Sequence, residues 1–161
     1  MSRHKNIVRR HKPTRGIKSV APQDYRALAE VRYVIRRFLS FSAEAARSAG
    51  IEPQQHQLLL VIKGLPLELA PTIGVVAERL QLHHNSAVEL VQRAEEQGMV
   101  TRRAGETDRR QVLLRVTARG ERVLRRLSVM HREELRSAAP VLLSALEELA
   151  RSPKPRRRSR Q

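Results

Sequence analysis

The chain has 161 residues, which suits one domain with short appendages. Lys and Arg number 32 against 16 Asp and Glu, and the resulting formal charge of +16 favours a polyanionic partner, above all nucleic acid. The sequence contains no cysteine and only four aromatic residues, which excludes disulfides, thiolate zinc sites and thiol chemistry and argues against stacking of single-stranded bases.

The two ends of the chain carry most of the excess charge. Residues 1–20 hold seven Lys and Arg, residues 151–161 hold six, and neither segment contains an acid. Both segments are poor in apolar residues, so we expect disordered basic tails around a folded domain at 21–150. Because no apolar run follows Met1 or reaches the length of a membrane span, we expect a soluble, cytoplasmic protein with no membrane partner.

Helical periodicity begins at the start of the folded domain. Apolar residues at steps of three and four predict an amphipathic helix over 22–49, which ends near Gly50. Pro53 can occupy the first turn of a second helix, and Gly64 and Pro66 stop that helix.

A helix-turn-helix is predicted next. Thr72 is placed to cap a short third helix, and a brief link leads to a fourth helix over about 84–97. Gly98 can end the fourth helix, where a left-handed residue is needed.

The hydrophobic period then changes to that of β-strands. Residues 99–103 and 112–116 flank a polar turn at 104–111, a pattern that predicts a β-hairpin. Thr117 is placed to cap a long helix through about Leu135, and a break at 137–140 is expected to precede a final helix.

This order predicts a mainly α fold with a small β-wing: a winged helix-turn-helix flanked by N- and C-terminal helices. The flanking helices carry more apolar surface than one such module needs for its core. Their surplus apolar faces therefore need a further partner.

Four short motifs stand in register across residues 76–120. They read Val76-Ala77-Glu78-Arg79-Leu80, Gly98-Met99-Val100-Thr101-Arg102, Asp108-Arg109-Arg110 and Val116-Thr117-Ala118-Arg119-Gly120. In sequence and spacing they resemble the MarR-type winged-helix transcriptional regulators, closely over 76–120 and by architecture only over the rest of 22–150. The resemblance implies a homodimer with interleaved terminal helices, a DNA-binding lobe over about 51–117 and dimerisation helices over about 22–49 and 118–150.

The same resemblance places the DNA-reading surface on the fourth predicted helix, since the major groove admits an α-helix. The residues implied are His84, Asn85, Ser86, Val88, Glu89, Gln92 and Arg93. The resemblance also implies that Leu90 and Val91 of this helix are turned toward the core. Asn85 or Gln92 could pair with adenine, Arg93 with guanine or phosphate, and Glu89 with the cytosine amino group. Ser86 and Glu89 also fit a Ser-x-x-Glu capping box, which needs no DNA and is compatible with DNA contact.

The wing is the second predicted contact. Arg102 and Arg103 precede a turn that bears Asp108, Arg109 and Arg110, and arginine suits a narrow minor groove. The resemblance suggests that Asp108 orients a neighbouring arginine while Arg109 or Arg110 reaches the groove. The alternative is a solvated charged turn.

Histidines raise the question of metal and ligand sites. His83 and His84 are adjacent and point about a quarter turn apart on a helix, so they form no chelating pair, and we expect neither a metal nor a cofactor. His56 lies where members of the family often form a small-molecule pocket between the dimer helices and the DNA-binding lobe. The alternative for His56 is a partly buried, hydrogen-bonded structural histidine.

No phosphate-binding glycine loop, nucleophile elbow or paired-carboxylate motif is present, so we do not expect an enzyme. The resemblance implies a homodimeric, sequence-specific regulator of double-stranded DNA with a palindromic operator, and a repressor that a small effector could release, because members of the family commonly block promoters. The alternative is a nucleoid- or ribosome-associated architectural protein, in which the basic tails dominate and sequence preference is slight.

Overall fold

The computed structural model describes residues 20–105 and 111–151. Within these residues, five helices and two strands follow one another along the chain. They are α1 (Pro22–Ser48), α2 (Pro53–Gly64), α3 (Ile73–Leu80), α4 (His84–Glu96), β1 (Val100–Ala104), β2 (Val112–Val116) and α5 (Ala118–Arg151). The segments predicted as tails lie outside the described residues except for Val20 and Arg151, and Arg151 still belongs to α5.

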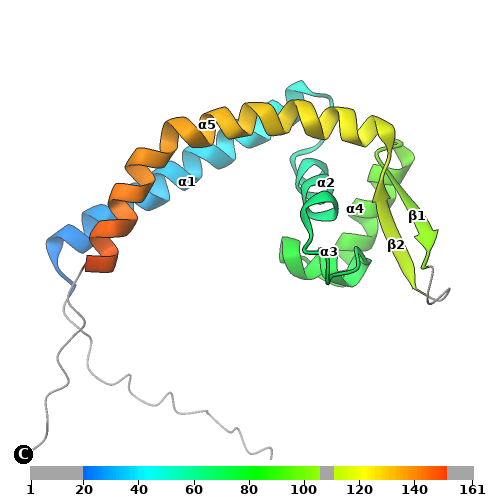
Figure 1. Ribbon diagram of the computed structural model, residues 1–161, viewed down its shortest axis with the longest axis horizontal. Helices are drawn as coiled ribbons and strands as arrows, with labels where there is room; N and C mark the ends of the chain where they lie inside the picture. Colours follow the sequence, from blue (N-terminus) through cyan, green and yellow to red (C-terminus); the bar gives the residue numbers. More distant parts are fainter. Residues whose placement is uncertain (1–19, 106–110, 152–161) are drawn as a thin grey trace, which may run out of the picture.

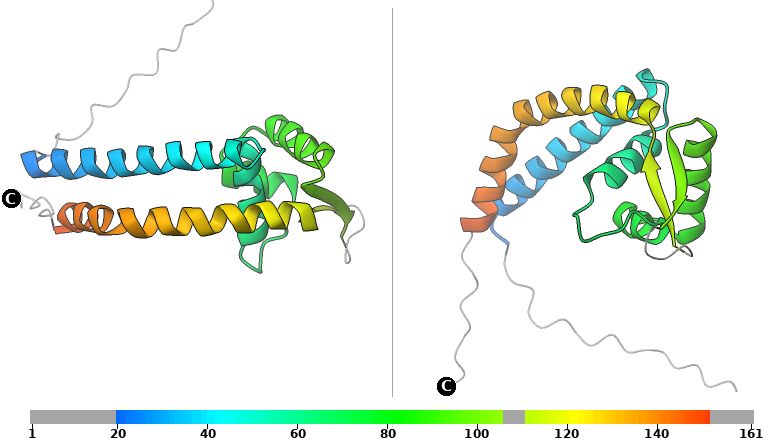
Figure 2. Two further views of the ribbon diagram at one scale, coloured as in Figure 1. Left: turned by 90° about the horizontal axis from the view of Figure 1, so that it is seen from above. Right: turned by 45° about the vertical axis from the view of Figure 1, so that its right-hand side comes forward.

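The architecture is a winged helix-turn-helix with two long flanking helices, as predicted. The helices α2, α3 and α4 and the β1–β2 hairpin form one lobe, while α1 and α5 run side by side away from it (Figure 1, Figure 2). The core of the lobe includes the fully buried side chains of Leu58, Leu59, Leu90 and Leu114, and Leu127 of α5 joins it. No helix in the described part of the chain is long and apolar enough to cross a membrane.

The helix-turn-helix forms where the breaker residues predict it. Thr72 caps α3, because its Oγ1 accepts a hydrogen bond from Val75 N at 3.3 Å. Gln81 ends α3 in the left-handed conformation with φ of +56°, and α4 begins three residues later. Gly98, with φ of +66°, closes the C-terminal end of α4 and confirms its predicted role.

The hairpin connects α4 to α5. Its strands are antiparallel, and Val100 lies opposite Val116. Thr117, which follows β2, connects the start of α5 to the turn between α4 and β1. Its Oγ1 accepts a hydrogen bond from Gly120 N at 3.1 Å, as a helix cap does, and donates one to Gly98 O at 2.6 Å. The prediction that Thr117 caps the next helix is therefore confirmed.

The break predicted at 137–140 was wrong, because α5 is one continuous helix with Pro140 inside it. A proline removes one backbone hydrogen bond and commonly bends a helix, and α5 bends in its C-terminal half (Figure 1, Figure 2). Ala138 and Val141, on either side of Pro140, line the same seam against α1. Packing on both sides of the proline thus continues the helix past a residue that would end an isolated one.

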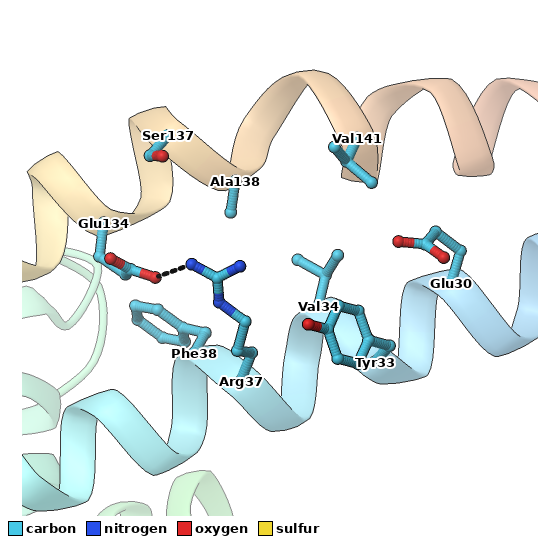
Figure 3. Close-up of a pocket in the computed structure, with 9 residues that line it drawn as sticks. All are labelled: Glu30, Tyr33, Val34, Arg37, Phe38, Glu134, Ser137, Ala138 and Val141. Atoms are coloured by element: carbon cyan, nitrogen blue, oxygen red, sulfur yellow. Dashed lines mark hydrogen bonds and ion pairs between the residues drawn. The ribbon is translucent and has the colours of Figure 1, made fainter.

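Polar contacts tie the elements together at their edges. Arg37 of α1 pairs with Glu134 of α5 at 3.5 Å across a small cavity of about 100 Å³ (Figure 3). Lys63 of α2 donates to Glu121 Oε1 of α5 at 2.6 Å, and this hydrogen bond lowers the pKa of the Glu121 carboxyl. Both pairs are exposed to solvent, so they help fix the position of α5 more than they stabilise the fold.

Candidate nucleic-acid interface

The predicted contact residues of α4 lie on the side of the helix that faces away from the core. Leu90 and Val91 are buried as expected, together with Ala87 and Ala94. Val88 is half-buried, and the remaining candidates are exposed: His84, Asn85, Ser86, Glu89, Gln92 and Arg93. The structure therefore brings one exposed, largely polar face to α4 and anchors the helix through its opposite face.

The capping box considered for Ser86 and Glu89 is not formed. The N-cap residue of α4 is His83, whose side chain makes no capping hydrogen bond, so Ser86 already lies within the first turn. Glu89 Oε2 instead lies 3.9 Å from Arg93 NH1, and Gln92 donates to Glu96 at 3.1 Å. These solvent-exposed interactions are weak, so Arg93 and Gln92 can exchange them for contacts with a ligand at little cost.

The two arginines of β1 differ in their surroundings. Arg102 is held against α4, since its Nε lies 3.5 Å from Glu95 Oε2 and its backbone N–H donates to Glu95 Oε1 at 3.3 Å. Neighbouring residues of a strand point to opposite faces, so Arg103 points away from Arg102 and is exposed. Nothing in the sequence pattern indicated the pairing of Arg102 with Glu95.

The tip of the wing belongs to the part of the chain that is not described. The three candidates Asp108, Arg109 and Arg110 lie outside the described residues. The described hairpin closes just before this segment with a hydrogen bond of 2.8 Å from Gly105 N to Gln111 O.

A second candidate site is a cavity of about 470 Å³ between α1, α2 and α5. Its lining residues are Phe38, His56, Leu60, Ser128, His131, Arg132, Leu135, Arg136 and Ala139. His56, the residue predicted for a ligand pocket, therefore does line a cavity at the junction of the lobe and the long helices. The α5 residues of this cavity were not predicted, since nothing in their local pattern distinguishes them from an ordinary amphipathic helix.

His56 is more deeply buried than the structural alternative assumed. Its side chain is only 3 % exposed, and its Nδ1 has no hydrogen-bond partner among the described residues. The alternative for His56 was a hydrogen-bonded structural histidine, and its Nδ1 does not make such a hydrogen bond. Burial, and secondarily the neighbouring His131, lower the pKa of His56 to about 4, so its ring is neutral at pH 7.

His131 lies beside His56, with ring centroids 4.6 Å apart, but its own nitrogens are occupied. Nδ1 lies 2.6 Å from Leu127 O, and because a carbonyl only accepts, this nitrogen carries the proton. In the neutral ring, Nε2 then accepts from the Ser42 hydroxyl at 2.8 Å. Two adjacent histidines thus have unequal roles: His131 is held by the protein, whereas His56 keeps an unused nitrogen.

The other histidine pair offers no metal site. His83 and His84 are exposed at the start of α4. Across residues 20–105 and 111–151, no group of three His, Asp or Glu side chains is arranged to hold a metal ion.

Comparison with known proteins shows which of them this chain is similar to. A model of the MarR family matches residues 49–111, whereas no curated protein sequence matches the chain. A MarR family protein from Bacillus stearothermophilus is structurally similar at 20 % identity, with a TM-score of 0.65 over 82 % of this chain and 96 % of that protein.

Two further similar structures contain bound partners. A mutant of MepR from S. aureus, bound to an oligodeoxyribonucleotide, has 16 % identity and a TM-score of 0.57 over 72 % of this chain and 82 % of that one. CouR from Rhodococcus jostii RHA1, bound to p-coumaroyl-CoA, has 19 % identity and a TM-score of 0.58 over 78 % of this chain and 92 % of that one. Residues 49–111 thus match a model of the MarR family, and the chain shares its fold with the MarR family protein from Bacillus stearothermophilus.

Proposed function

We propose that the protein is a sequence-specific regulator of transcription that binds a palindromic operator in double-stranded DNA as a homodimer, most simply as a repressor. The observation that carries this proposal is the exposed polar face of α4 in a MarR-type winged helix. A structural relative, the MepR mutant, is bound to an oligodeoxyribonucleotide. By this proposal the DNA-binding lobe is about 51–117, and the helices over 22–49 and 118–150 form the dimer.

The exposed face of α4 has the chemistry that major-groove reading requires. Asn85 and Gln92 can each pair bidentately with adenine, and Arg93 can pair with guanine or a phosphate. Glu89, next to Arg93, can accept a hydrogen bond from a cytosine amino group. Arg103 and the wing residues Arg109 and Arg110 would add contacts to phosphates or to the minor groove, and Asp108 would orient a neighbouring arginine.

The dimer is supported by apolar surface that one chain leaves uncovered. Leu28, Ile35 and Leu39 lie on one side of α1 at steps of seven and four, and each is about half exposed. Ile35 and Leu39 line a groove of about 280 Å³ between α1 and α5, and its other lining residues are Val34, Phe38, Leu135, Ala138, Ala139, Leu142 and Leu143. A contiguous apolar surface of this kind is typical of a protein–protein interface, and a second copy of the chain can cover it.

We further propose that a small organic anion binds in the His56 cavity and controls DNA binding. The cavity combines apolar walls with Arg132 and Arg136, and the structural relative CouR binds p-coumaroyl-CoA. It contacts α2 of the lobe as well as α1 and α5, so a ligand there can favour one position of the lobe relative to the long helices. A change in the spacing of the two lobes would break their register with the operator.

A second candidate is an architectural nucleic-acid-binding protein with little sequence preference. The charge distribution favours it, since 13 of the 16 net positive charges lie in 1–20 and 151–161. Flexible basic segments contact phosphates and release counterions without reading sequence. The two candidates differ in whether substitutions on α4 change specificity or only affinity.

Gln92→Ala tests the assignment of α4. Gln92 is exposed and bonds only to Glu96, so the fold should be unaffected, while affinity for the preferred duplex should fall about tenfold or more through loss of a base contact. Affinity for random DNA should change little. The matched control is Gln57→Ala on the exposed side of α2, which should leave both affinities unchanged.

Fluorescence titrations of both variants on both duplexes give the answer, with thermal unfolding as a check on the fold. Equal losses on preferred and random DNA would transfer support to the architectural candidate.

A further inference from the structure

We infer that Glu95 is a positioning residue for DNA binding: it holds Arg102 on the inner face of the β-hairpin, so that Arg103 is the arginine of β1 that contacts the phosphate backbone. The inference rests on the proposed function and adds to it the residue that aligns the hairpin with α4. Both arginines of β1 were predicted as DNA contacts, and only one of them keeps that role.

The two arginines lie on opposite faces of the hairpin. Side chains alternate between the faces of a strand, so Arg102 shares a face with Val100, two residues earlier, and with Leu114, which lies opposite it on β2. Val100 and Leu114 are buried in the core of the lobe, so this is the inner face of the hairpin. Arg103 lies on the outer face, where it is exposed and pairs with none of the described carboxylates.

Glu95 holds Arg102 through both of its carboxylate oxygens. Oε2 lies 3.5 Å from Arg102 Nε, and Oε1 accepts the backbone N–H of the same residue at 3.3 Å. Met99 O and Gly105 N form hydrogen bonds across the hairpin, and because bonding alternates along an antiparallel strand, the N–H of Arg102 points away from β2. The Glu95 carboxylate therefore satisfies the outer edge of β1, where a third strand would otherwise bond.

This ion pair is better shielded than its neighbour on α4. The side chains of Arg102 and Glu95 are 37 % and 36 % exposed, against 51 % and 69 % for Arg93 and Glu89. Shielding from solvent strengthens an ion pair, whereas fully exposed pairs contribute little. The Glu95–Arg102 pair also joins two elements, so its loss should change the position of the hairpin relative to α4.

The contact lies next to the DNA-reading face of α4. Gln92, which we propose pairs with a base, precedes Glu95 by three residues, and residues at this spacing are neighbours on a helix. The hairpin is thus anchored within one helical turn of a base contact. A side chain held at a fixed distance from that contact need not be ordered when DNA binds, so the alignment of Arg103 favours binding.

A salt series tests which arginine contacts DNA. Arg103→Ala and Arg102→Ala are each titrated by fluorescence with a duplex recovered by selection. Loss of one phosphate contact lowers the slope of log affinity against log salt by about one. We expect this decrease for Arg103→Ala and an unchanged slope for Arg102→Ala. A decrease of about one for Arg102→Ala overturns the inference, because Arg102 then contacts DNA itself.

A double-mutant cycle tests the role of Glu95. Glu95→Gln removes the ion pair, while Leu114 N still donates to Pro71 O at 2.8 Å and holds β2 in place. Affinity for the duplex should fall about threefold or more, since Glu95 and Arg103 act together. With Arg103→Ala already present, the same substitution should cost less than about twofold, because the contact to be positioned is gone. Equal losses in the two backgrounds overturn the role of Glu95.

The matched control is Glu78→Gln, which removes an exposed carboxylate from α3 and changes the net charge equally. The affinity of Glu95→Gln is compared with that of this control, so that the general effect of charge on DNA binding is excluded. Thermal unfolding checks the fold of each variant. If Glu95→Gln does not fold, the slopes of Arg102→Ala and Arg103→Ala decide the inference.

The outcomes separate this inference from the proposed function. If selection recovers no motif, sequence-specific regulation is contradicted, and the same slopes and cycle measured on random duplex decide the role of Glu95. Absence of binding to any duplex overturns the proposed function and the role of Glu95 together.

Discussion

Gly120→Ala should lower the free energy of unfolding by about 3 kcal/mol or more, the range in which single substitutions disrupt a fold. A Cβ at this position would overlap the carbonyl oxygen of Met99 and lie 2.8 Å from Val116 Cγ1. The carbonyl cannot easily move, because it accepts the backbone hydrogen bond from Thr117 N at 3.0 Å. Gly120 thus allows α5 to start directly against the hairpin.

The matched control is Gly74→Ala in α3, where the nearest atom to a new Cβ is Thr72 Oγ1 at 3.9 Å. Alanine favours a helix over glycine, so this variant should be stabilised by about 0.5–1 kcal/mol. Urea unfolding followed by circular dichroism measures both changes. A Gly120→Ala protein as stable as the wild type would show that the contact between α5 and the hairpin is wrongly placed.

Ile35→Asp combined with Leu39→Asp should convert the proposed dimer to a folded monomer. Both side chains line the apolar groove and are about half exposed in one chain, so charges there are tolerated in the monomer but are unpaired in a dimer interface. Since two linked lobes bind two half-sites with an advantage of about 10²–10⁴, affinity for the operator should fall at least a hundredfold.

The control for this double variant is Tyr33→Asp, on the side of α1 that lines the small cavity of Figure 3. Tyr33 is exposed to a similar extent, and its replacement should leave the dimer intact. Sedimentation velocity gives the mass, and DNA titration gives the affinity. If Tyr33→Asp dissociates the dimer while the double variant does not, the partner docks on the opposite face of α1.

Much of the fold could be predicted because its boundaries are encoded locally. Thr72 and Gly98 act through their own backbone neighbourhood, so their effects are visible in the sequence. The predicted helix break at 137–140 was wrong because it considered only the local tendency of Pro140 to end a helix. Packing against α1 on both sides of the proline outweighs that tendency. Tertiary packing of this kind cannot be deduced from the residues next to the proline.

The candidate site also has one part that could be predicted and one that could not. The exposed face of α4 could be predicted through the resemblance, and the burial of Leu90 and Val91 on the opposite face agrees with it. The environment of His56 could not, because it depends on His131 and on Ser42, which come from two other helices. The sequence marked His56 as a ligand residue only through resemblance, whereas its unpaired nitrogen is a property of the folded chain.

Selection of duplex DNA from a random pool by the full-length protein tests the central claim most directly. Two symmetry-related α4 helices that read equivalent half-sites should recover a palindromic motif, with half-site centres about one duplex turn apart. The Gln92→Ala protein should recover a motif with relaxed preference at one symmetric pair of positions. Recovery of no motif, despite tight binding to the pool, would contradict sequence-specific regulation and support the architectural candidate.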